Sequence, residues 1–361
     1  MTTVLSEIPV ASTGQAPGSL TGLPCTGTAE AAVCVDWFSC TFAVQKHWTV
    51  DGTVSWFLQK AGYLIDDQEM LDYGKFGYSR LMRINEGALL MWNPERAEMG
   101  VHLEIPSSAF GSFLAAGDTI EGLIDFLVND LRGKPTRLDI AFDDFAGLLQ
   151  IDEITRWCES GWFTSKWQIM RSENEFRHSV GSMLPRGRII RFGRRTSKSY
   201  ARIYDKHLEQ IATGKACEHE HWHRVEIEFK GVKAEAATRL LFADDRPDKL
   251  RGVLLGHLDF KSPSDTDSNT RRWDTTDWWL RFLNNVGKVQ LGIPKPSRSV
   301  EKTGKWMENC LLPSIALVVE AMTDGNRERE IEYFDKIVAD GKARWKEQEA
   351  RMLRDYRREH G

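Results

Sequence analysis

The spacing of hydrophobic and polar residues becomes regular near residue 33. There β-branched and aromatic residues crowd into VCVDWFSCTFAV, a composition typical of a strand. Further on, two strand-like runs flank Glu86-Gly87, a pair that favours a hairpin turn. Pro106 ends another strand, and Ser107-Ser108 can cap a helix. The predicted elements are a strand at 33–44, an amphipathic stretch at 54–61, a hairpin at 78–92, a strand at 101–105 and a helix from 107 through 131.

The same order recurs in the next stretch of chain. RLDIAFD and RVEIEFK are strand-like, and a hairpin with a basic turn lies between them. Asp36 takes the place of Asp139, and 103–105 that of 225–227. We therefore predict an α+β fold with an internally duplicated, two-lobed core of mostly antiparallel sheet and helices on one face. The predicted elements are a strand at 137–143, a helix at 151–160, a hairpin at 188–206, a strand at 224–230 and a helix at 234–242.

The ends of the chain differ from this core. Residues 1–32 are rich in Gly, Pro, Ser and Thr without a sustained period, which predicts a mobile leader. After residue 245 come a polar stretch, an aromatic helix candidate at 278–286 and alternating charges from Asn326 onward. We predict a core at 33–245, with lobes at about 33–133 and 134–245, and a mainly helical C-terminal region at 246–361.

Composition sets limits on function. The 361 residues are 41% hydrophobic and 28% charged, which excludes a fully disordered or collagen-like chain. No apolar run approaches the length of a membrane span, and the N-terminus lacks the pattern of a secretory signal, so we expect a cytoplasmic protein without membrane contact. The net charge of -4 means that affinity for nucleic acid must come from a local patch.

The candidate chemistry lies on one face of the predicted strands. Side chains alternate across a strand, so each of these strands has one apolar face and one face with ionisable groups. Carboxylates gathered from separate strands favour Mg²⁺ or Mn²⁺. A tyrosine flanked by Arg and Lys beside them could attack a phosphodiester. The ionisable positions are Arg137, Asp139 and Asp143; Tyr200, Arg202, Tyr204 and Lys206; Arg224, Glu226, Glu228 and Lys230; and His102 and Glu104.

The hairpin turn carries a dense basic patch. Eight basic residues and a single acid, Asp205, lie between residues 186 and 206. Aromatic side chains interleave with them, a pattern that suits a nucleic-acid backbone and its bases. The basic residues are Arg186, Arg188, Arg191, Arg194, Arg195, Lys198, Arg202 and Lys206.

The succession VDWFSCTF, RLDIAFDD, RFGRRTSKSYARIYDK and HWHRVEIEFKG, over residues 33–245, resembles the replication initiation factor family. These proteins are rolling-circle initiators and relaxases of plasmids, integrative elements and filamentous phages. The resemblance implies a saddle-like core and Tyr204 as the nucleophile, joined to the 5′ phosphate of a cut strand. It also implies a divalent-metal site, Mg²⁺ or Mn²⁺, at Asp139 with Glu226 or Glu228.

We therefore expect a metal-dependent, site-specific single-strand DNA endonuclease and ligase that initiates rolling-circle replication of a phage or plasmid. Arg202 and Lys206 would assist Tyr204. Origin DNA, single-stranded or in a hairpin, is the expected partner, with a host helicase and a homodimer as further candidates. The alternative is a non-catalytic DNA-binding regulator on the same fold. The expected DNA contacts are Arg188, Arg191, Arg194, Arg195, Lys198 and Arg224.

Two assignments stay open at this point. Tyr200 shares a face with Tyr204 and could be the nucleophile instead. In CEHEHWH, the alternating Cys217, His219, His221 and His223 could gather ligands for Zn²⁺.

Overall fold

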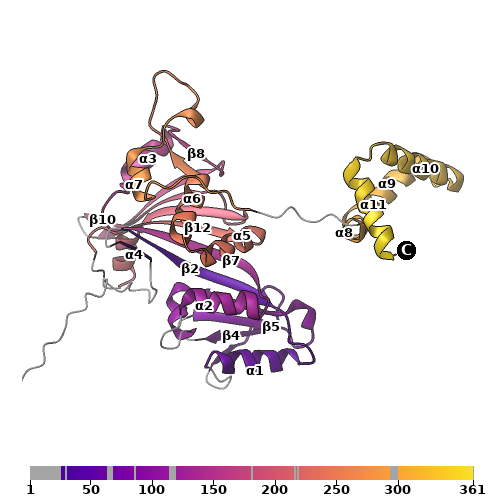
Figure 1. The fold of residues 1–361 in the computed structure, drawn as a ribbon, viewed down its shortest axis with the longest axis horizontal. Coiled ribbons are helices and arrows are strands. Elements are labelled where there is room, and N and C mark those ends of the chain that lie inside the picture. The colour runs from indigo at the N-terminus through magenta and orange to yellow at the C-terminus, as the bar shows by residue number, and fades with distance from the viewer. Residues whose placement is uncertain are drawn as a thin grey trace, which may run out of the picture. The chain divides into compact units, whose positions relative to one another are not determined.

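The computed structural model describes residues 26–28, 31–62, 68–84, 87–113, 119–179, 182–214, 217, 219–292 and 300–360. The chain divides into two compact units, 1–293 and 294–361, and each is described by itself. The first is built on a large antiparallel sheet and the second on helices (Figure 1). Most of the predicted leader lies outside the described residues, but its last part forms strands, so ordered structure begins earlier than residue 33.

The first half of the sheet unit has the predicted order of elements. A strand leads into a helix, a hairpin and a further strand, and the helix begins where the Thr49 hydroxyl accepts a bond from the Gly52 amide. The single helix predicted from 107 through 131 is wrong, since a 3-10 helix at Ser107–Phe113 and a separate helix take its place. The elements are β1 (Thr26–Thr28), β2 (Ala31–Phe42), α1 (Val50–Lys60), β3 (Glu69–Leu71), β4 (Arg80–Ile84), β5 (Ala88–Trp92), β6 (Val101–Pro106) and α2 (Ile120–Asp125).

The second half repeats that order with longer strands. Its hairpin is extended by one strand that the sequence analysis did not predict, Met170–Ser179. Asp205 ends one strand and caps the next helix by accepting a bond from the Leu208 amide. The elements are β7 (Lys134–Asp144), α3 (Ile151–Glu159), β8 (Phe163–Ser165), β9 (Met170–Ser179), β10 (Ser182–Phe192), β11 (Ser199–Asp205), α4 (Lys206–Ala212), β12 (His223–Lys230) and α5 (Val232–Thr238).

The two halves meet at the pair β2–β7, in the middle of the sheet (Figure 1). From β2 outward the order is β6, β5, β4, β3, and from β7 outward it is β12, β11, β10, β9. Every pairing is antiparallel, which confirms the predicted sheet type. The strand order is thus mirrored about the central pair, while the duplication and the saddle shape stay predictions.

One hydrophobic core serves both halves. It joins side chains from α1, α2, α3 and α5 to the apolar faces of the central strands, including Phe38, Leu103, Leu138, Val225 and Ile227. Because residues alternate along a strand, burying these faces leaves the other face of the same strands for the ionisable groups.

The sheet unit extends beyond residue 245, where the sequence analysis placed the end of the core. The added part consists of α6 (Arg246–His257), β13 (Leu258–Phe260) and α7 (Asp277–Phe282). β13 pairs with β8, and Trp279 of α7 is fully buried in the common core. The boundary moves because these apolar side chains are buried against the sheet rather than in a separate region.

The second unit is helical, as predicted for the end of the chain. Asn326 caps its longest helix by accepting bonds from the amides of Glu328 and Arg329. Among the described residues, no helix has the length and apolar character needed to cross a membrane. The helices are α8 (Val300–Trp306), α9 (Leu312–Thr323), α10 (Arg327–Ala343) and α11 (Glu347–His360).

Candidate nucleic-acid cleavage site

The ionisable groups lie on one face of β7, β12 and β11, which are neighbours in the sheet. Directly paired residues of antiparallel strands project to the same side. Arg202 is opposite Glu226, Tyr204 is opposite Arg224, and Glu228 is opposite Asp139. The sheet therefore brings acids, arginines and a tyrosine from three strands onto a common face, as the alternation of the sequence predicts.

Tyr204 lies at the centre of this group. Its hydroxyl donates to Glu226 Oε2 over 3.3 Å, and its side chain is buried. The guanidinium of Arg202 is 5.0 Å from the ring centroid and Lys206 Nζ is 5.7 Å from it. Burial raises the pKa of Tyr204 well above its usual value, so the phenol is protonated at neutral pH and needs a proton acceptor before it can attack.

Glu226 is the acceptor within reach. Arg202 Nη2 donates to both of its carboxylate oxygens, each over 2.7 Å. Burial raises the pKa of Glu226, although the charge of Arg202 opposes the shift. A carboxylate with a raised pKa is a stronger base than one in water, so its contact with the Tyr204 hydroxyl forms an acid-base pair.

Arg224 is placed differently from its prediction as a DNA contact. Its Nε and Nη2 donate to the two oxygens of Asp143 at 2.7 and 2.8 Å, and its Nη1 donates to Asp36 Oδ1 at 2.6 Å. Only 1% of the residue is exposed, and Trp222 Nε1 also donates to Asp143. With its donors committed to two carboxylates, Arg224 is positioned to stiffen β2, β7 and β12 behind Tyr204 rather than to meet a phosphate.

Asp139 is held by Arg137, whose Nε donates to Oδ1 over 2.9 Å and whose Nη2 is 3.1 Å from Glu228 Oε2. Burial raises the pKa of Asp139 to about 7 despite these bonds, and the negative charges of Glu226 and Glu228 act in the same direction. The carboxylates are thus near enough to repel one another.

The predicted metal centre requires several ligand atoms that converge on one ion. Oxygen donors of this kind suit Mg²⁺ or Mn²⁺. Within the described ranges, however, no three acidic, histidine or cysteine side chains converge as an ion would require. Arg137 holds Asp139, and Arg202 holds Glu226. As arranged, Asp139, Glu226 and Glu228 do not fit a three-carboxylate centre, and the metal stays a prediction.

The basic residues of the β10–β11 hairpin form two groups, one ion-paired and one exposed. Arg188 Nη1 is bound 2.7 Å from Asp152 of α3, and Arg191 is paired with Glu173. By contrast, Arg194, Arg195 and Lys198 lie exposed in the turn between β10 and β11, where no carboxylate of the described residues pairs with them. The turn is therefore the part of the patch that is free to meet an anion.

A pocket of about 640 Å³ opens beside Tyr204. Part of α4 and the strands β9 to β11 form its walls. Four arginines line it together with Tyr204, namely Arg186, Arg188, Arg191 and Arg202, and so do four acids, Glu173, Glu175, Asp205 and Glu209. Arg188, Arg191 and Arg202 are already paired with carboxylates, so a phosphate here would take the place of an acidic partner next to a phenol.

The two assignments that the sequence left open are Tyr200 as the nucleophile and the zinc group that begins at Cys217. The ring of Tyr200 lies 6.0 Å from the Arg195 guanidinium, and within the described structure its hydroxyl makes no hydrogen bond. Tyr204 alone contacts a carboxylate. In the candidate zinc group, the Cys217 thiol donates to the His219 carbonyl and the His219 ring packs 4.2 Å from Phe145. The described part of that group therefore makes local structural contacts, with no cluster of three ligands.

Sequence analysis gave no role to several residues that build the site. Asp143, Arg137 and Trp222 all contact its charged groups. Alternation along RLDIAFD correctly placed Arg137 and Asp143 on the face of Asp139, but it could not give their partners. The contact of Trp222 with Asp143 depends on tertiary structure and carries no local pattern.

Comparison with known proteins gives a matching family model, a related sequence and a similar solved structure. The family model "Replication initiation factor" matches residues 133–334, more than half of the chain. The candidate DNA relaxase NicK of Bacillus subtilis (strain 168) is 27% identical over 194 residues, which are 52% of this chain and 54% of that protein. The chain thus matches about half the length of this curated relative.

The third match is a solved structure, a rolling circle replication initiator protein from Geobacillus stearothermophilus. It superposes with a TM-score of 0.60 at 23% identity and covers 73% of this chain and 100% of its own. At this identity the likeness establishes the fold. The family match begins at residue 133 rather than at 33, so it contains the second half of the sheet, with the candidate site, and omits the first.

Proposed function

Because the chain belongs to the replication initiation factor family, we propose that it nicks and rejoins one strand of DNA and thereby starts rolling-circle replication of a phage or plasmid. The observation that carries the proposal is the contact of the Tyr204 hydroxyl with Glu226 beside an arginine-lined pocket. Tyrosine, general base and phosphate-binding cations are the groups that a strand transfer needs.

The proposed reaction is a transesterification. Tyr204 Oη attacks the phosphorus of a phosphodiester and forms a tyrosyl ester with the 5′ phosphate, while the bond to the 3′ oxygen breaks. The phenolic proton passes to Glu226, and the departing 3′ oxygen takes up a proton to become a free hydroxyl. Reversal of these steps rejoins the strand, because the ester retains the energy of the original bond.

Arg202 links the proton transfer to the phosphate. It is bound to both oxygens of Glu226, so protonation of that carboxylate weakens the ion pair. The guanidinium is then released toward the charge that develops on the phosphate. Lys206, at the first position of α4 and near the Tyr204 ring, adds a second cation.

A requirement for Mg²⁺ or Mn²⁺ is a separate proposal. Its support is the oxygen chemistry of Asp139, Glu226 and Glu228 alone, since their arrangement does not form a three-carboxylate centre, and no step above depends on it. Adduct formation measured with each ion and with a chelator tests it, and full activity in the chelator would refute it. The predicted helicase partner and the homodimer likewise stay predictions.

One observation favours the alternative of a DNA-binding regulator without chemistry. Tyr204 is only 5% exposed, and its raised pKa makes it a poor nucleophile unless the proton is removed. Incubation of the full chain with single-stranded origin DNA, followed by denaturing electrophoresis, separates the two functions, because only the enzyme leaves a covalent adduct.

Tyr204→Phe is expected to abolish the adduct, because it removes the attacking oxygen, and to leave noncovalent DNA binding nearly intact. Tyr200→Phe is the matched control and should retain the adduct. If the Tyr204 variant still formed an adduct and the Tyr200 variant did not, the nucleophile would be Tyr200.

A further inference from the structure

Four cations, one beside β8 and three near the β10–β11 turn, have no acidic partner among the described residues. They are Lys166, Lys198, Lys233 and Arg271, which together form the basic strip. Within the described ranges, none of them is ion-paired, whereas Arg137, Arg202 and Arg224 on the catalytic face all are. Lys166 Nζ instead contacts the Gln290 amide oxygen at 3.2 Å, and Lys233 Nζ donates to Ser199 Oγ at 2.8 Å.

Trp167 joins the two ends of the basic strip. Its Nε1 donates to the Ser199 carbonyl over 3.0 Å, and its backbone amide donates to Ser165 Oγ over 2.9 Å. A Cβ atom at Gly193 would lie 2.6 Å from the Trp167 ring, and the backbone there has a φ of +85°, so both space and conformation call for glycine. The indole is thereby fixed against the β10–β11 turn, and Lys166 directly precedes it in the chain.

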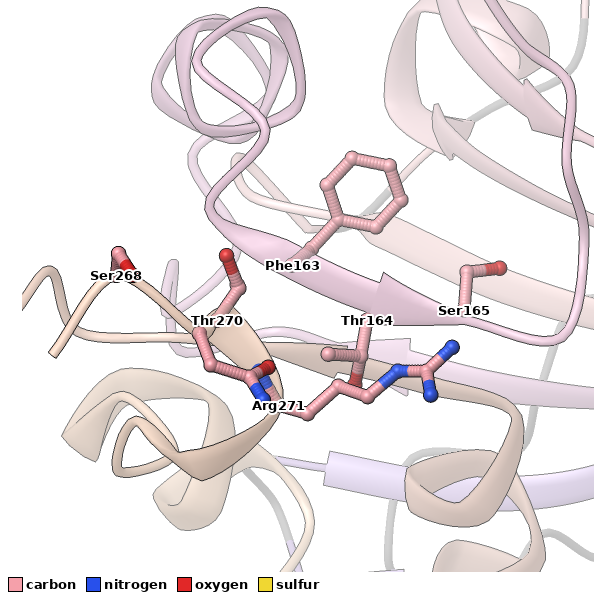
Figure 2. A pocket seen from close by; sticks show the side chains of 7 residues that line it. Phe163, Thr164, Ser165, Ser268, Thr270 and Arg271 are labelled. Atoms are coloured by element: carbon pink, nitrogen blue, oxygen red, sulfur yellow. The ribbon is translucent and has the colours of Figure 1, made fainter.

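A polar pocket of about 570 Å³ continues the basic strip past Ser165. Figure 2 shows Arg271 extended along β8 on the side to which Thr164 points, while the side chains of Phe163 and Ser165 point the other way. No carboxylate belongs to the residues found to line the pocket. Its polar lining is Thr164, Ser165, Ser268, Asn269, Thr270 and Arg271.

The lysines of the strip repel one another. Burial lowers the pKa of Lys233, and the positive charges of Lys166 and Lys198 lower it further. An anion that contacts several of these lysines at once offsets their mutual repulsion and stabilises their charged forms. Because the donors come from β8, the β10–β11 turn, α5 and the 3-10 helix at Thr270–Arg272, a single small anion would not reach them all.

We propose that the basic strip and its hydroxyl-lined pocket bind the phosphate backbone of the DNA strand beyond the phosphate that is cut. The inference rests on the proposed function and deepens it. Lys198 belongs to the same turn as Arg195, whose guanidinium faces Tyr200 on the catalytic face. A strand that leaves the pocket beside Tyr204 can therefore follow the turn onto the strip. Hydroxyls and cations that contact only phosphates position DNA without reading its sequence.

The test uses the full-length triple variant Lys166→Gln, Lys233→Gln, Arg271→Gln. Binding to two single-stranded DNAs is measured at several salt concentrations, one long and one covering only the cut site. At about 0.7 per phosphate contact, the slope of log affinity against log salt should fall by about 2 for the long strand. Affinity for the long strand should fall roughly tenfold or more, and affinity for the short strand should not change.

Two controls keep the result specific. Lys249→Gln removes a lysine that is ion-paired with Asp245, 2.8 Å away, and should leave the slope unchanged. The double variant Lys166→Arg, Lys233→Arg keeps the charges and should keep the slope, which separates loss of charge from loss of fold.

An unchanged slope in the triple variant would overturn the inference, as would a loss confined to RNA of the same length. The adduct assay with wild-type protein and Tyr204→Phe is read separately. If adducts form and the slope is unchanged, only the strip is refuted. If the slope falls and no adduct forms, the proposed chemistry is refuted instead.

Discussion

The two halves of the sheet share one pairing pattern and differ in the side chains that it presents. In the second half, Arg202 is opposite Glu226 and Tyr204 is opposite Arg224. In the first half, Leu89 is opposite Glu104 and Met91 is opposite His102. Arg202 on β11 therefore corresponds to Leu89 on β5, and Tyr204 corresponds to Met91. The order of strand pairing is common to both halves, and the candidate reactive groups lie in one.

Glu104 on β6 and Glu226 on β12 hold corresponding positions, and their pKa values shift in opposite directions. Glu104 lies 2.6 Å from Lys75, and its bonds to His102 and Lys75 outweigh burial and lower its pKa. Burial instead raises the pKa of Glu226, beyond what Arg202 offsets. The first glutamate is a stable anion, and the second is ready to accept a proton. Corresponding positions on the two strands thus hold a structural ion pair in one half and, in our proposal, a base in the other.

The largest effect is expected when each glutamate is replaced by glutamine. Glu226→Gln removes the proton acceptor of Tyr204 and should slow adduct formation by roughly 10²–10⁴-fold. Glu104→Gln, the matched change in the first half, should leave the rate unchanged. Single-turnover kinetics with a labelled oligonucleotide measure both. Equal losses in the two variants would show that the halves do not differ in this way.

Replacing the arginine behind the site should cost stability rather than speed alone. Arg224→Gln leaves Asp143 buried without its bidentate partner, so the free energy of unfolding should fall by about 3–5 kcal/mol. His102→Gln at the matching position affects the bond to Thr41 and the contact with Glu104, and should cost about 1–2 kcal/mol. Urea unfolding followed by tryptophan fluorescence gives both values. A smaller loss for Arg224 than for His102 would contradict the role assigned to it.

The smallest effect concerns pH. The pKa of Asp139 is raised in the folded protein from 3.8 to about 7, so the folded state favours the protonated group. Its contribution to stability is complete below pH 3.8 and is lost as the pH rises through 7. Asp139→Asn should lack this loss. The melting temperature of the variant minus that of the wild type should therefore increase by about a few °C between pH 5 and pH 8. A constant difference between the two proteins over that range would contradict the shift.

Local patterns were sufficient to predict the central strands and the face that bears the chemistry. RLDIAFD, RVEIEFK and SYARIYD alternate cleanly because one face packs in the hydrophobic core and the other carries ionisable groups, most of which are also buried. The same pattern could not give the depth of burial, which is why Arg224 was predicted to meet DNA. Its burial depends on Asp36, a partner on a strand 188 residues away in sequence.

One helix of the sheet unit was missed for a physical reason. Helix α6 was missed because its residues from Leu250 to Leu255 are all buried. A helix buried all round has no polar stripe and therefore no period of 3.6 residues to detect.

The central claim is that Tyr204 is the residue that becomes joined to DNA. The most direct test is mass spectrometry of the peptide that remains attached to a cleaved oligonucleotide after proteolysis. The account predicts a 5′-phosphate ester on the phenol of Tyr204. An ester on Tyr200, or cleavage that leaves no peptide on the DNA, would contradict it.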